Sequence, residues 1–142
     1  MEHKPVVDLE TVADVTVAKR ILSRHERLIR WAEALARSPG RVLKPLHGIE
    51  FMSSKLRRDA RTDYSPLTVA YEDPVLRAEG LASDRLGDAM DFFELSEREA
   101  HAALCSCHLG SSFEAGAAAK RVRGLADRAA SRLRAVLSRL LG

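Results

Sequence analysis

The sequence predicts an all-α protein, an irregular helical bundle with long first and last helices and several short helices between them. Hydrophobic residues make up 46% of the chain and aromatic residues only 5%, so alanine, leucine and valine carry the apolar content. Alanine and leucine are the strongest apolar helix formers. Apolar residues recur at helical spacing near both ends, and prolines and glycines punctuate the middle. At 142 residues one domain is expected over 1–142, with 1–10 as a flexible N-terminal segment.

The first long helix is predicted from Thr11 to Arg37. Its apolar positions follow the three- and four-residue spacing of an amphipathic helix. Ser38, Pro39 and Gly40 then form a stop signal. The residues that define the apolar face are Ala18, Ile21, Leu22, His25, Leu28, Ile29, Ala32 and Leu35.

Short helices are predicted from Tyr64 onward. Ser65-Pro66 and Asp73-Pro74 each place a capping residue before a proline, which is typical of a helix start, and Gly80 is expected to end the second helix. Ser83-Asp84 is predicted to cap a third helix. The capping box Ser96-Glu97-Arg98-Glu99 opens a fourth, expected to end near Gly110. Residues 41–62 fit either short helix or extended chain.

The last helix is predicted to open at a second capping box, Ser111-Ser112-Phe113-Glu114. Gly124 is a candidate point of interruption. We expect the apolar stripe to pack on the first helix as a wall of the core, since this is the usual role of amphipathic helices in small domains. The stripe comprises Val122, Leu125, Ala129, Leu133, Val136, Leu137 and Leu140.

Charge is segregated along the chain. Residues 1–62 hold 13 basic and 8 acidic side chains, residues 63–110 hold 3 and 10, and residues 111–142 hold 7 and 2. This pattern has two interpretations. Either the basic segments bind an anionic partner, or the acidic segment faces them within the fold.

Four residues form the densest group of reactive side chains: His101, Cys105, Cys107 and His108. On one continuous helix His101, Cys105 and His108 would share a face. Imidazole and thiolate together suit zinc, and they also suit iron in a cluster or haem. A redox-active thiol is a further alternative. Alternatively, Cys105 packs as a small apolar residue and His108 interacts with a helix C-terminus. No cofactor is therefore predicted, and a metal or haem stays an alternative.

The stretch from Leu95 to Val122 resembles the opening of a response-regulator type helix-turn-helix, on its capping residues and on Gly110. The resemblance implies a recognition helix in a DNA major groove. The chain departs from this pattern after Val122, where Gly124 is the only turn signal and the apolar stripe requires burial. Candidate anion or nucleic-acid contacts are Arg121, Arg128, Arg132, Arg134 and Arg139.

The chain contains no phosphate-binding glycine loop, nucleophile elbow or HExxH pair, which favours a non-enzymatic role. It has no apolar run long enough for a signal peptide or membrane span, and two cysteines one residue apart argue against a disulfide. We therefore expect a cytoplasmic protein acting through protein contacts, as a regulatory adaptor or an oligomer. The alternatives are a nucleic-acid-binding regulator and a metal, haem or thiol sensor.

Overall fold

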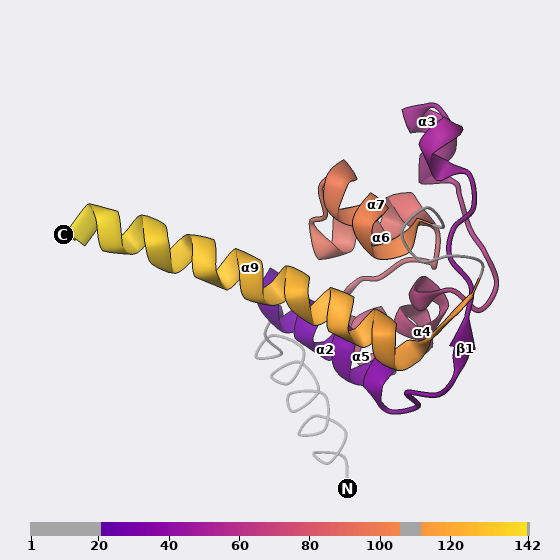
Figure 1. Ribbon diagram of the computed structural model, residues 1–142, viewed down its shortest axis with the longest axis horizontal. Helices are drawn as coiled ribbons and strands as arrows, with labels where there is room; N and C mark the ends of the chain where they lie inside the picture. The colour runs from indigo at the N-terminus through magenta and orange to yellow at the C-terminus, as the bar shows by residue number, and fades with distance from the viewer. Residues whose placement is uncertain (1–20, 106–111, 142) are drawn as a thin grey trace, which may run out of the picture.

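The computed structural model describes residues 21–105 and 112–141, with the backbone alone from 129 to 134. The described chain is mostly helical, as predicted, and it also contains one small two-stranded sheet (Figure 1). The elements in chain order are α2 Arg24–Ala36, β1 Val42–Leu43, the 3-10 helix η1 Ile49–Phe51, α3 Ser54–Arg58, α4 Pro66–Glu72, α5 Pro74–Glu79, α6 Leu86–Phe93, α7 Glu97–Leu104, β2 Phe113–Glu114 and α9 Ala115–Leu141.

Helix α2 begins at a capping box that the prediction of one helix over 11–37 did not include. The Ser23 hydroxyl accepts a hydrogen bond from the Glu26 backbone N–H at 3.1 Å, and the Glu26 carboxylate accepts one from the Ser23 N–H at 2.8 Å. Because an N-cap residue has extended dihedrals, residues 21–23 are not helical, and the continuous helix is wrong at this point. Residues 1–20, with the expected flexible segment 1–10, lie outside the described residues.

The short helices mostly follow the sequence signals. Ser65 and Asp73 cap α4 and α5, Gly80 ends α5, and Ser96 opens α7 with a capping box. The prediction for α6 is wrong by one residue, because its N-cap is Arg85, while the Ser83 hydroxyl accepts the Arg85 N–H at 3.0 Å.

The start of α9 differs from the sequence prediction. Phe113 and Glu114 form strand β2, which pairs antiparallel with β1, so they do not open the helix as part of a capping box. The first helical N–H groups are instead satisfied by a backbone loop: Ala115 donates to the Arg41 carbonyl at 2.8 Å and Gly116 to the Pro39 carbonyl at 2.9 Å. These bonds anchor α9 to the chain that follows α2.

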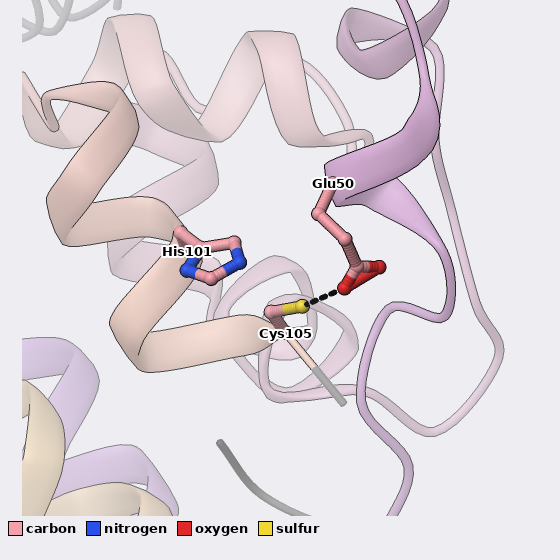
Figure 2. A group of neighbouring side chains, drawn as sticks. All are labelled: Glu50, His101 and Cys105. Atoms are coloured by element: carbon pink, nitrogen blue, oxygen red, sulfur yellow. Dashed lines mark hydrogen bonds between the residues drawn. The ribbon is translucent and has the colours of Figure 1, made fainter. Parts of the chain in front are cut away.

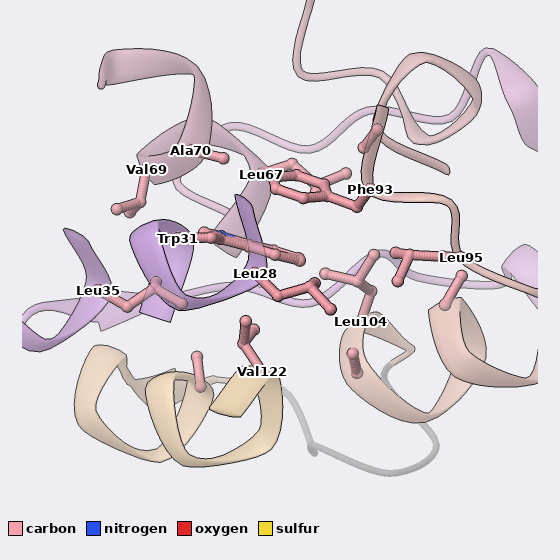
Figure 3. Close-up of a cluster of buried hydrophobic side chains, with 14 of the residues drawn as sticks. Leu28, Trp31, Leu35, Leu67, Val69, Ala70, Phe93, Leu95, Leu104 and Val122 are labelled. Atoms are coloured by element: carbon pink, nitrogen blue, oxygen red, sulfur yellow. The ribbon is translucent and has the colours of Figure 1, made fainter. Parts of the chain in front are cut away.

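The core is centred on Trp31 of α2 (Figure 3). Its ring stacks on Phe93 of α6 with centroids 4.4 Å apart, and its indole N–H donates to the Pro66 carbonyl at 2.9 Å. A buried Trp with a satisfied N–H combines a large apolar area with a directional anchor. Leucines from α2, α4 and α7 surround it, so one cluster joins the middle helices to α2 and α9.

Helices α2 and α9 make the most extensive contact between described elements. The buried face of α9 is rich in alanine, which allows the two helix backbones to approach closely. The buried residues are Ala115, Ala118, Ala119, Val122, Leu125 and Ala126. Beyond this face, α9 extends away from the other described elements (Figure 1).

The acidic segment pairs with basic residues of the first segment, as the second interpretation of the charge pattern expects. The ion pairs that join the two segments are Arg24–Glu99, Arg30–Asp73, Arg41–Glu72, Arg57–Glu97, Arg58–Asp91 and Arg61–Asp84. Each links residues at least 20 positions apart in sequence, so charge segregation here contributes to tertiary structure.

The Arg30–Asp73 pair is the most buried of these on its acidic side, because the Asp73 side chain is only 1% exposed. Arg30 donates two hydrogen bonds to the carboxylate, at 2.6 and 2.9 Å, and Asp73 also accepts the Val75 N–H at the start of α5. The hydrogen bonds from Arg30 lower the pKa of Asp73 below its ordinary value of 3.8.

A carboxyl group whose pKa is lower in the folded state stabilises the protein above its unfolded-state pKa. That stability is lost as the pH falls through the folded value. We predict that Asp73→Asn lowers the free energy of unfolding by about 1–3 kcal/mol at neutral pH. In this variant the free energy of unfolding should also fall less steeply than in the wild type as the pH drops below about 4. Urea denaturation at several pH values measures both effects.

Asp91→Asn is the matched control. Its carboxylate lies at the same 2.6 Å from an arginine, but its side chain is 66% exposed. An exposed pair contributes little to stability. Equal decreases in the free energy of unfolding in the two variants would contradict the larger contribution expected from Asp73.

Candidate functional site

Three side chains that can bind a metal ion converge in the described structure: Glu50, His101 and Cys105. We call them the Glu-His-Cys cluster. Their ligand atoms all lie within 4.8 Å of one another. Figure 2 shows the Glu50 carboxylate on η1, the His101 imidazole on α7 and the Cys105 sulfur directly after α7 around a common space.

Backbone hydrogen bonds hold these elements together. The Leu46 N–H donates to the Leu104 carbonyl at 2.8 Å, and Leu46 and Cys105 form a parallel bridge. Gly48 then adopts a φ of +69°, a left-handed conformation that glycine accommodates without strain, and the chain turns into η1. Glu50 is thereby placed beside the end of α7.

The Cys105 thiol is fully buried and donates a hydrogen bond to Oε2 of Glu50 at 2.9 Å. Glu50 and His101 are partly exposed, so the cluster lies at the boundary between core and solvent. A pocket of about 340 Å³ borders it. The pocket is lined by Ile49, Glu50, Arg57, Leu86, Glu97, Arg98, Ala100 and His101. The arrangement therefore combines one buried sulfur with oxygen and nitrogen ligands that a solute can reach.

The structure changes the predicted ligand set. Helix α7 ends at Leu104, and Cys105 has extended dihedrals of φ −81° and ψ 142°, so the expected helical face shared by His101, Cys105 and His108 is wrong. His101 and Cys105 do come together, while Cys107 and His108 lie outside the described residues. Sequence reasoning missed Glu50, because 55 residues separate it from Cys105 and no local pattern indicates their contact.

The candidate anion contacts lie along α9. Arg121 donates from Nη1 to the Ala102 carbonyl at 3.1 Å, and Arg128 and Arg139 are exposed. The side chains of Arg132 and Arg134 lie outside the described residues.

The structure agrees with the departure from the helix-turn-helix pattern that the sequence indicates after Val122. Helix α9 runs without a break from Ala115 to Leu141, through Gly124. No turn and second helix therefore follow Val122.

A second candidate site is the distal half of α9, which we define as residues 128–141. Four apolar side chains near its end are exposed: Val136 is 41% exposed, Leu137 47%, Leu140 76% and Leu141 87%. The predicted core wall is therefore wrong at Val136, Leu137 and Leu140, while the side chains of Ala129 and Leu133 lie outside the described residues. Among the described helices, none combines the length and apolar character needed to cross a bilayer.

An apolar groove of about 330 Å³ lies between α2 and α5. We call it the α2–α5 groove. Its lining residues are Leu22, His25, Glu26, Ile29, Arg30, Glu33 and Val75. Glu26 and Glu33 are exposed at this groove, and Arg30 is already paired with Asp73. The groove thus offers apolar side chains beside two carboxylates.

In comparisons with known proteins, no family model, no curated protein and no solved structure matches the chain.

Proposed function

We propose that this is a non-enzymatic helical protein that acts through protein contacts, and that its distal α9 docks on a second copy of the chain. The observation that carries the proposal is the exposed apolar stripe on distal α9. Solvent exposure of several neighbouring leucines on a projecting helix is typical of an interaction surface. In the proposal the occupied surface on the second copy is the α2–α5 groove.

The energetics of the projecting helix support this proposal. Most helical stability in proteins comes from tertiary packing, and residues 135–141 at the end of α9 are exposed. Burial of apolar surface contributes about 25 cal/mol per Å². Docking of Leu137 and Leu140 would therefore stabilise both the helix and the complex.

Charge favours the groove over a pairing of two distal helices. Residues 128–142 contain four arginines and no acidic residue, so two such helices side by side would repel each other. The α2–α5 groove instead offers Glu26 and Glu33 beside apolar side chains. If each copy docks its helix on the other, the contact closes into a dimer.

The proposal includes a cytoplasmic location, because a reducing compartment keeps the Cys105 thiol reduced. It includes no catalytic step. We propose that such a dimer acts either as a regulatory adaptor or as a self-contained oligomer.

We predict that the purified full chain forms dimers in size-exclusion chromatography with light scattering. The variant Leu137→Glu/Leu140→Glu should weaken dimerisation at least about tenfold, because it places charges in the apolar contact. Leu56→Glu is its control, since Leu56 is exposed on α3 away from both surfaces. A wild-type protein that stays monomeric at high micromolar concentration would overturn the proposal.

The groove is tested by Val75→Glu, with Val42→Glu on β1 as the matched control, because both valines are exposed. We predict that Val75→Glu alone prevents dimerisation and that Val42→Glu does not. Mixing the Val75→Glu protein with the Leu137→Glu/Leu140→Glu protein should restore a 1:1 complex, since one intact helix then meets one intact groove. Dimerisation that is insensitive to Val75→Glu would show that two distal helices pair instead, and would contradict the groove.

Nucleic-acid binding is the second candidate function, favoured by the exposed Arg128 and Arg139 on the projecting helix. It predicts duplex DNA binding whose affinity falls linearly with salt on a logarithmic scale. Replacement of Arg128, Arg132 and Arg134 by alanine should then reduce that slope. Fluorescence anisotropy at several salt concentrations measures it, and salt-independent binding would contradict this alternative.

A further inference from the structure

We infer that the Glu-His-Cys cluster is a zinc site, with Glu50, His101 and Cys105 as its protein ligands. The chemistry of the donor atoms selects the metal. Thiolate sulfur, imidazole nitrogen and carboxylate oxygen are the three ligand types that proteins use for Zn²⁺, whereas magnesium and calcium take oxygen ligands. This inference is independent of the dimer proposed above.

The geometry is close to what zinc requires. Zinc–ligand distances of about 2.0–2.3 Å in a tetrahedral site place neighbouring ligand atoms roughly 3.3–3.7 Å apart. The three atoms already lie within 4.8 Å of one another, and the sulfur and the Glu50 oxygen are 2.9 Å apart. The Glu50 and His101 side chains are partly exposed, so their rotation toward a metal is less restricted than movement of the buried Cys105.

Zinc binding would replace the hydrogen bond inside the cluster. In the described structure the Cys105 thiol donates to the Glu50 carboxylate. When zinc binds, the S–H bond breaks, the sulfur–zinc bond forms, and the proton passes to solvent.

Three protein ligands leave one tetrahedral position for water or another small ligand. The pocket that borders Glu50 and His101 gives that position access to solvent. The inferred site therefore has the open coordination of a zinc ion that can exchange ligands.

The test is zinc titration of chelator-treated full-length protein in competition with a chromophoric chelator. We expect one zinc ion per chain with a dissociation constant of about 1 μM or below at neutral pH, and weaker binding at lower pH because the thiol proton must leave. Cobalt in place of zinc should give a thiolate-to-cobalt charge-transfer band and the visible bands of tetrahedral cobalt.

The variants separate a binding role from a structural one. Glu50→Gln and His101→Ala change partly exposed side chains, and each should weaken zinc binding roughly ten- to a hundredfold or more. Cys105→Ser should in addition abolish the charge-transfer band. Circular dichroism checks that each variant is folded. His25→Ala is the control and should bind like the wild type.

Two results would overturn the inference. One is wild-type protein that does not compete for zinc at micromolar concentration. The other is zinc binding that survives in folded Glu50→Gln and His101→Ala proteins.

Discussion

Helices α2 and α9 lie against each other along a face that α9 builds mainly from alanine. Small side chains let two helix backbones approach closely, and this approach leaves Trp31 on α2 to pack toward α4 and α6. Gly116 follows the same requirement at the start of α9, where an added Cβ would lie 3.2 Å from the Pro39 Cβ. The middle helices are organised around a pair of helices that come from opposite ends of the described chain.

Ion pairs join the middle helices to α2 and to the segment that follows it. Arg24 and Arg30 project from α2 to Glu99 and Asp73, while Arg57, Arg58 and Arg61 reach the acidic segment from the other side. Most of these pairs are partly exposed, so each contributes little on its own. Their sum selects which surfaces meet, since opposite charges are arranged across the contacts between segments far apart in sequence.

Local signals in the sequence predicted local structure well. Ser65, Asp73 and Ser96 begin helices because their capping chemistry involves only neighbouring residues. The errors arise where distant backbone decides the outcome. Phe113 is part of a strand because it pairs with Leu43, and Cys105 leaves the helix at the bridge to Leu46. Capping and periodicity carry no information about such partners.

The same distinction applies to the candidate sites. His101 and Cys105 were recognisable as a pair because they are four residues apart on and next to one helix. Glu50 was not, because its contact depends on the fold of the whole middle segment. The periodicity of α9 correctly marked Val122 and Leu125 as buried, but it could not show where the neighbouring helix ends.

A single hydrogen-bonded helix thus has two different environments along its length. The proximal half of α9 can open only if its packing on α2 is broken, whereas the distal half can fray from the C-terminus without disturbing the core. In a monomer, the backbone amides of α9 should therefore exchange with solvent deuterium slowly up to about Ala126 and quickly beyond it. A partner that covers the distal half would lower the exchange rates of its amides. The position of the boundary between slow and fast amides along α9 would then report whether a partner is bound.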